Sequence, residues 1–203
     1  MKRNRSDPKS PRAPSGAAVR STDLTERLVR ALFEEWAETG YAAISLERVA
    51  GRAGAGKAAI YRRWSSKLQF AREALDLVAL DITDISDQGS LEADLLAYLR
   101  VLRRVLRHRL VRRILPDLHA ERLRSKDLAE LLERLTRQRR ARGEEILIRG
   151  IERGELPANI DRAMALDLLP AALYWRMIVT DGHASVAELR AQARCLCAAL
   201  RAC

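Results

Sequence analysis

Residues 45–67 read SLERVAGRAGAGKAAIYRRWSSK and contain two short helical patterns separated by a glycine turn. The first pattern begins at Ser45, whose hydroxyl suits an N-cap, and stops at Gly54, which permits the left-handed backbone of a tight turn. In the second pattern, Ile60 and Trp64 lie four residues apart, so both face one side of a helix. A short helix, a tight turn and a second helix with polar outward positions form a helix-turn-helix, whose second helix enters the DNA major groove.

The outward positions of this motif are the candidate DNA contacts. Near the start and middle of the second helix, the residues expected to face outward are Lys57, Ala58, Tyr61 and Arg62. Residues 45–72 hold seven basic residues and one acid, a net charge of +6 within 28 residues. This density is typical of binding to the phosphate backbone. The alternative is a solvated basic face on a small helical bundle.

Outside the motif, apolar residues again recur with helical spacing, and almost no stretch alternates with a period of two. One helix is expected from Leu24 to Gly40, and another begins at Ser66 and Gln69, which have capping-box spacing. Further helices are expected at about 91–107, 110–123, 126–153, 161–180 and 185–202. The sequence therefore predicts an all-α fold, in which a three-helix head is joined by its fourth helix to a larger helical body.

These patterns divide the chain into three segments. Residues 1–23 carry six basic residues and three prolines, too few apolar groups to offset ordering, and are expected to form a disordered basic arm. This arm either contacts DNA or is a solvated tail. Residues 24–84 would form the helix-turn-helix domain with its linking fourth helix, and residues 85–203 the C-terminal helical domain.

Composition limits the function classes. The 203 residues include 37 Lys and Arg against 27 Asp and Glu, a net charge of +10, so an acidic partner is expected. Nucleic acid is the first candidate, although a basic average also suits a membrane surface. Three cysteines, all near the C-terminus, are too few for a secreted disulfide scaffold and fit a reducing cytoplasm. We expect no membrane span, because charged residues interrupt every apolar stretch well short of a bilayer thickness.

The motif as a whole resembles the N-terminal signature of the TetR, or tetracycline-repressor, family. In that signature a glycine-containing turn leads into a helix that ends in Tyr, two polar residues and an aromatic. The resemblance is carried by Gly54–Trp64, by Ser66 and Lys67 after it, and by Val49, Ala50 and Ala53 before it. It covers about residues 24–80 well, and the C-terminal half only in its helical layout. It implies a DNA-binding transcriptional regulator, usually a repressor that a small-molecule effector releases from its operator.

The resemblance implies DNA-binding roles for specific positions of this chain, which are Ser45, Arg48, Lys57, Ala58, Ala59, Tyr61, Arg62, Arg63 and Lys67. Of these, Lys57, Ala58 and Arg62 would lie near base edges. Phosphates would be held by Tyr61 and Lys67, and the DNA backbone would be approached by Ser45 and Arg48. Where the family usually has Val, Ser and Thr, this chain has Ala55, Gly56 and Ala59. Operator affinity is therefore expected to depend more on Arg62, Arg63 and the basic arm.

The resemblance also implies that the body dimerises and binds the effector. The last two helices, about 164–180 and 186–202, would pair with their twins, and the homodimer would read a palindromic double-stranded operator. A monomeric core using the same apolar residues is the alternative. Candidate effector-pocket residues, which could also be simple core, are Tyr98, Leu102, Leu118, His119, Leu147, Tyr174, Trp175 and Met177. An acid-free set of arginines either attracts an anionic ligand or forms a solvated face: Arg100, Arg103, Arg104, Arg107, Arg109, Arg112 and Arg113.

An enzyme is the first rival class. The sequence has no P-loop, no dinucleotide-binding glycine fingerprint and no residue set that suggests a catalytic triad. Cys195 and Cys197 would point to opposite sides of a helix, so they cannot chelate one metal ion unaided. We therefore expect no catalytic residue, metal or cofactor. The second rival is a non-specific, basic nucleic-acid-binding helical protein without a ligand response.

Overall fold

The computed structural model describes residues 16–80 and 85–203, and every regular element in these two ranges is helical. The predicted all-α fold is confirmed. In chain order, the elements are α1 (Gly16–Thr39), α2 (Leu46–Arg52), α3 (Lys57–Tyr61), α4 (Lys67–Leu80), α5 (Leu91–Leu106), α6 (Arg109–Glu121), α7 (Lys126–Glu152), α8 (Arg162–Tyr174), its π-helical continuation η1 (Trp175–Val179) and α9 (Val186–Arg201).

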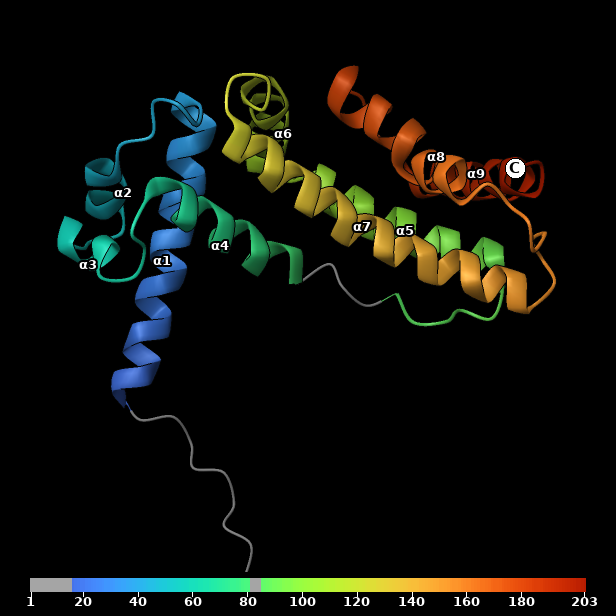
Figure 1. The fold of residues 1–203 in the computed structure, drawn as a ribbon, viewed down its shortest axis with the longest axis horizontal. Coiled ribbons are helices and arrows are strands. Elements are labelled where there is room, and N and C mark those ends of the chain that lie inside the picture. Colours follow the sequence, from blue (N-terminus) through green and yellow to red (C-terminus); the bar gives the residue numbers. More distant parts are fainter. Residues whose placement is uncertain (1–15, 81–84) are drawn as a thin grey trace, which may run out of the picture.

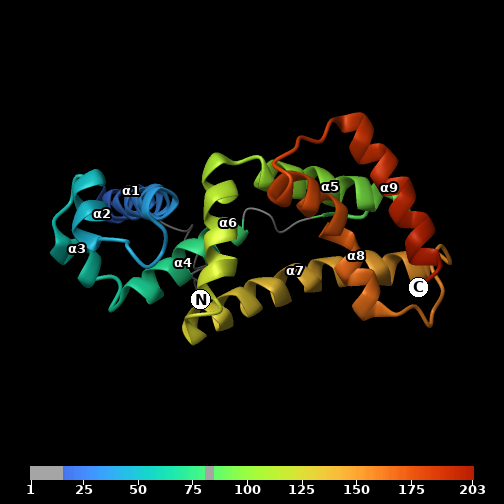
Figure 2. The same ribbon diagram turned by 90° about the horizontal axis from the view of Figure 1, so that it is seen from above.

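The molecule is elongated, with a small head at one end and a larger helical body at the other (Figure 1). The head is formed by α1, α2 and α3, and α4 leads away from it. In the body, α5 and α7 run lengthwise, and α8 and α9 cover the end that lies farthest from the head. Seen from above, α6 stands between the two parts (Figure 2). It packs against α1 of the head as well as against α5 and α7 of the body.

Residues with special backbone conformations set the limits of the head helices. Gly40 follows α1 with φ +77°, and Gly54 follows α2 with φ +64°, so both take the left-handed conformation that favours glycine. Ser45 caps α2, since its side chain accepts a hydrogen bond from the backbone N–H of Arg48. The turn predicted at Gly54 and the cap predicted at Ser45 are confirmed.

The first helix begins earlier than the sequence pattern predicted. α1 starts at Gly16, so residues 16–23, which we expected in a disordered arm, form its first turns. Alanines at positions 17 and 18 favour helix, and a helix already stabilised by its packed part extends at little cost. The remainder of the expected arm, residues 1–15, lies outside the described residues.

The hydrophobic core of the head extends beyond the head itself. It includes Ile114 and Leu118 of α6 and Leu128 and Leu131 of α7, which pack with the buried residues of α1 to α4. A second core lies between α5, α7, α8 and α9. The domain boundary expected near residue 84 therefore does not coincide with the boundary between the two hydrophobic cores.

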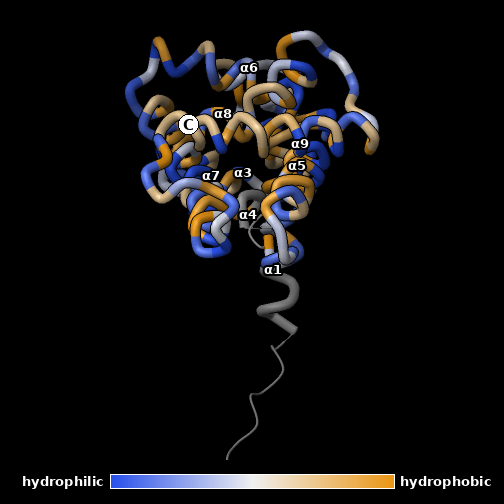
Figure 3. The backbone as a smooth tube through the Cα atoms, turned by 90° about the vertical axis from the view of Figure 1, so that its right-hand side faces the viewer, coloured by the Kyte–Doolittle hydropathy of each residue, from blue (hydrophilic) through white to orange (hydrophobic). Residues whose placement is uncertain are grey.

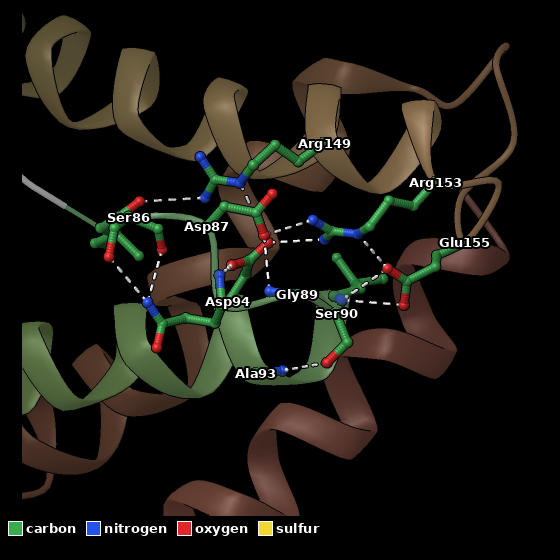
Figure 4. A network of polar contacts seen from close by, with 12 residues as sticks. Ser86, Asp87, Gly89, Ser90, Ala93, Asp94, Arg149, Arg153 and Glu155 are labelled. Carbon is green, nitrogen blue, oxygen red and sulfur yellow. Dashed lines mark hydrogen bonds and ion pairs between the residues drawn. The ribbon is translucent and has the colours of Figure 1, made fainter.

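A polar network fixes the chain where it enters the body (Figure 4). Asp94 of α5 is fully buried and accepts hydrogen bonds from Arg153 at 2.8 Å, from Arg149 at 3.3 Å and from the backbone N–H of Gln88 at 2.8 Å. Glu155 accepts a further bond, at 2.9 Å, from the backbone N–H of Leu91. These contacts hold the segment before α5 against the C-terminal end of α7.

Candidate nucleic-acid interface

The helix-turn-helix is held together by small and large apolar residues. Ala50 and Ala53 are buried where α1, α2 and α3 meet, and their small size allows the helices to approach closely. Ile60 and Trp64 are buried as well, and the Trp64 ring stacks on Phe70 with 3.8 Å between ring centroids. This packing anchors α3 to α4 and leaves its other side exposed.

The exposed side of α3 carries four of the predicted DNA contacts, Lys57, Ala58, Tyr61 and Arg62. The helix is short and ends at Tyr61, whereas the sequence pattern placed Trp64 in it as well. Its turn nevertheless continues, because the backbone N–H of Arg62 donates to the Ala58 carbonyl at 3.1 Å. Tyr61 is 49% exposed, which is unusual for an aromatic residue that serves only a core.

One of these cationic side chains, Lys57, is already paired with an acid of the head. The ammonium of Lys57 forms an ion pair with Glu47 of α2, and it also lies 5.6 Å from the centroid of the Tyr61 ring. The hydrogen bond from Lys57 lowers the pKa of Glu47, so this carboxylate stays charged beside the surface that would face DNA.

Arg48 serves the interior of the head, a role that the sequence pattern did not reveal. Its guanidinium donates to Glu35 of α1 at 2.6 Å and to the Ala43 carbonyl at 3.0 Å. Glu35 is fully buried, and Arg52 lies 3.5 Å from its other carboxylate oxygen. Buried carboxylates require such partners. Glu35 follows Leu32 by three residues, on the buried stripe of α1, and this position was the signal that could have identified it.

Two further residues that were predicted to contact DNA, Ala59 and Arg63, lie wholly or partly inside the head. Ala59 is only 6% exposed and packs inside the head, so its side chain offers almost no surface to DNA in this structure. The face of α3 that holds Ile60 also turns Ala59 inward. Arg63 is half-buried and donates to the Ala59 carbonyl at 3.1 Å.

Lys67 holds the loop between α1 and α2. Its ammonium donates to the carbonyls of Tyr41 and Ala42 at 2.9 and 3.0 Å and lies 4.7 Å from the Tyr41 ring centroid. Burial lowers the pKa of Lys67 and raises that of Tyr41 to about 12. Two of the three donors of this ammonium are thus committed to the loop rather than to a phosphate.

The predicted effector-pocket residues do not form one group. Tyr98, Leu147 and Met177 are buried in the body core, and Leu102 and Tyr174 pack against it. Leu118 belongs to the core of the head, because α6 turns this residue toward α1 and α7. Trp175 is 62% exposed on the outer side of η1. These two placements correct the expectation. His119 is half-buried, with its ring edge-on to that of Tyr174 at 6.0 Å.

Comparison with known proteins identifies both parts of the chain. The sequence model for bacterial regulatory proteins of the tetR family matches residues 28–74, and the model for the tetracyclin repressor-like C-terminal domain matches residues 85–196. The chain belongs to the TetR family. The transcriptional regulator YdeS of Bacillus subtilis is 28% identical over 163 residues, which cover 80% of this chain and 82% of that protein. The DNA-binding transcriptional repressor TetR of Mycobacteroides abscessus is 32% identical over 144 residues, 68% of this chain and 73% of that protein.

Solved structures of TetR proteins share this architecture. The TetR family transcription regulator SCO0332 matches with a TM-score of 0.65 and 29% identity, covering 87% of this chain and 97% of that one. The fatty acid degradation regulator FadR of Bacillus halodurans matches with a TM-score of 0.73, 16% identity and coverage of 87% and 99%, a likeness of fold alone. This chain is therefore a DNA-binding transcriptional regulator, of a family whose members bind operator DNA and dimerise. None of the helices in the described ranges is long and apolar enough to span a membrane.

Proposed function

We propose that this TetR protein is a homodimeric, cytoplasmic repressor that a small-molecule effector releases from a palindromic operator. The observation that carries the proposal is the exposed face of α3, where Lys57, Ala58, Tyr61 and Arg62 stand outside a packed helix-turn-helix. Arg62 is the strongest candidate for reading a base, since it is exposed and makes no ion pair with any described residue.

Dimerisation is supported by an apolar stripe on α8 and η1. The stripe follows helical spacing and is exposed or half-buried along its whole length: Met164, Leu168, Ala171, Trp175 and Val179. Leu169 and Leu173, on the other face of the same expected dimer helix, are buried within the protomer. Figure 3, which faces the end of the body away from the head, shows hydrophobic stretches along α8 and α9. A second copy of this chain is the natural cover for such a face.

Effector binding is supported by a polar set between α5, α6, α7 and α8. Tyr98, His119 and Tyr174 make no hydrogen bond through their side chains to any described residue, and Arg139 makes no ion pair there. Burial raises the pKa of Tyr98 to about 12, and the charge of Arg139 opposes that shift. Burial also lowers the pKa of His119, with Arg122 and Arg139 acting in the same direction. Unpaired polar groups beside an apolar core are the groups that orient a bound ligand.

Release of the operator would follow if the effector prefers one placement of the head over another. The body reaches the head through α4 and α6, so a ligand beside His119 of α6 lies next to that connection. A preference of about 1–3 kcal/mol between the two placements would change operator affinity by about 5–150 fold.

Selection of bound duplexes from a random pool tests the DNA-binding part. We expect a palindrome whose half-sites are centred about one DNA turn apart, near 34 Å. Arg62→Ala should lose base preference, whereas Arg100→Ala, an exposed arginine of α5, should select the same sequence as the unchanged protein. Recovery of unrelated sequences with a strong salt dependence would instead identify a non-specific binder.

The dimer is tested separately by sedimentation. Trp175→Glu places a charge in the proposed interface and should give monomers. The matched control is Leu123→Glu, which changes an apolar residue that is 81% exposed in the turn between α6 and α7. Dimers of equal stability in both variants would contradict the proposed interface.

A further inference from the structure

Two open hollows flank the N-terminal half of α6, and both are lined by Arg109 and Arg113. The first, of about 480 Å³, lies between α6 and α1, and its other lining residues are Glu34, Ala37, Glu38 and Leu110. The second, of about 420 Å³, lies between α6 and the segment that joins η1 to α9. Its other lining residues are Arg112, Asp181 and His183.

The second hollow has an excess of positive charge. It brings together three guanidinium groups and one imidazole but only one carboxylate, that of Asp181, which forms an ion pair with Arg112. Arg113 makes no ion pair with a described residue, and the nearest acid of Arg109 is Glu34, at 4.0 Å. On the other side of α6, both arginines also line the first hollow, where Glu34 and Glu38 lie. Within the second hollow the single carboxylate is paired with Arg112, so Arg109 and Arg113 have no carboxylate partner on this side.

The wall of this hollow is held in place by contacts of its own. The segment that joins η1 to α9 forms this wall, and its Asp181 is paired with Arg112 of α6. The Ala184 carbonyl of the same segment accepts a hydrogen bond from Arg103 of α5 at 3.1 Å. Within that segment, the backbone N–H of Gly182 donates to the Arg176 carbonyl at 2.7 Å. Asp181 takes a left-handed backbone with φ +54°, an uncommon conformation that its surroundings must maintain. The cations thus face a preformed wall.

We propose that this second hollow is a binding site for a compact, phosphate-bearing anion. Guanidinium groups present planar pairs of N–H donors that match phosphate oxygens, and His183 adds a further donor when protonated. Every residue that lines the hollow is polar or charged, and none of them belongs to α3 or to the proposed effector set. It is thus a ligand site distinct from both the DNA interface and the proposed effector set.

Such an anion would act near the joint between head and body. α6 carries Arg109 and Arg113 toward the hollow and, one to two turns later, carries Asp117 into contact with the head. Charge neutralisation on α6 would also reduce the repulsion between its closely spaced arginines. We therefore expect anion binding to stabilise the folded protein.

The test is calorimetric titration of the full chain with inorganic pyrophosphate, at an ionic strength held constant with sodium chloride. We expect saturable binding in the unchanged protein. In the double variant Arg109→Ala, Arg113→Ala the affinity should fall by about tenfold or more, because two charge-assisted contacts are lost. Arg113→Lys should bind with intermediate affinity, because it keeps the charge but loses the fork. The matched control, Arg100→Ala with Arg104→Ala, removes two exposed arginines that line neither hollow and should stay within twofold.

A second control separates this site from the DNA interface. Arg62→Ala should lose operator preference but bind pyrophosphate like the unchanged protein. Loss of pyrophosphate binding in Arg62→Ala, equal binding in the Arg109/Arg113 double variant, or no saturable binding at millimolar pyrophosphate would each overturn the proposal. None of these outcomes depends on whether the protein represses transcription.

Discussion

The indole Nε1 of Trp36 donates a hydrogen bond to Oδ2 of Asp117 at 2.6 Å, and the same oxygen accepts from the backbone N–H of Tyr41 at 2.9 Å. Trp36 is buried at the end of α1, so one carboxylate of α6 holds both a core residue of the head and the loop that follows it. Gly40 fits beneath the same group, since a Cβ at this position would lie 3.0 Å from Oδ1 of Asp117. This contact is the clearest polar link between the two parts of the molecule.

Removing that link should destabilise the protein. Asp117→Ala leaves the Trp36 indole without its acceptor, which should lower the free energy of unfolding by about 1.5–3 kcal/mol, as measured by urea denaturation. Glu130→Ala, an exposed acid of α7 with no ion pair among the described residues, should change it by less than about 0.5 kcal/mol. Equal losses in the two variants would show that the contact contributes nothing specific.

Glu47→Gln should strengthen DNA binding. The variant removes a negative charge beside the exposed face of α3 and releases Lys57 from its ion pair, so one more cation can reach a phosphate. Anisotropy titrations at several salt concentrations should show higher affinity and a salt slope that is steeper by about one. Glu133→Gln, which breaks a similar pair with Arg137 on α7, serves as the control. An unchanged slope in Glu47→Gln would mean that Lys57 does not contact the duplex.

Arg48 and Arg62 should separate stability from DNA binding. Arg48→Ala leaves the buried carboxylate of Glu35 with the more distant Arg52, which should cost about 1–2 kcal/mol of unfolding free energy, allowing for the half-exposed guanidinium. Arg62→Ala should leave the thermal midpoint unchanged while operator preference falls. The opposite pattern would reverse the roles assigned to these two arginines.

Asp94 should make the protein sensitive to acid. Burial alone would raise its pKa, but hydrogen bonds from Arg153, Gln88 and Arg149 outweigh this effect and hold the pKa below its ordinary value. A lowered pKa in the folded state means that the contribution is complete at neutral pH and is lost as the pH falls below about 4. Asp94→Asn should therefore be less stable than the unchanged protein at pH 7 and should lose less stability on acidification. Asp167→Asn, an exposed acid of α8, should follow the unchanged protein throughout.

The parts of the fold that depend on neighbours along the chain could be predicted from the sequence. The cap at Ser45 and the turn at Gly54 both act within a few residues, so residue type and spacing suffice. The roles of Arg48 and Lys67 could not be predicted, because their acceptors lie 13 and 26 residues away, on α1 and the loop after it. Basic residues near a recognition helix resemble phosphate contacts whether or not an acceptor is waiting inside the protein.

Helical periodicity also leaves open which neighbour each face of a helix meets. α6 lies between two cores, so the same apolar pattern would suit Leu118 in a pocket of the body or in the core of the head, where the structure has it. In α8 and η1 both faces are apolar, and only packing distinguishes the buried Leu173 from the exposed Trp175. The helix expected at about 164–180 to form the dimer therefore contains the outer stripe, but the pattern alone could not separate this stripe from the core face.

The core that the head shares with α6 and α7 limits how this regulator can be recombined with others. Phe70 and Ala74 of α4 are fully buried in that core, and Asp76 is paired with Arg134 of α7 at 2.6 Å. A chimera joined near residue 84 would give these residues a foreign α6 and α7 and so replace part of the core in which they are buried. A donor head that keeps its operator preference would have to bring its own α6 and the first turns of its α7, which makes the transferable unit larger than the DNA-binding domain and discontinuous in sequence.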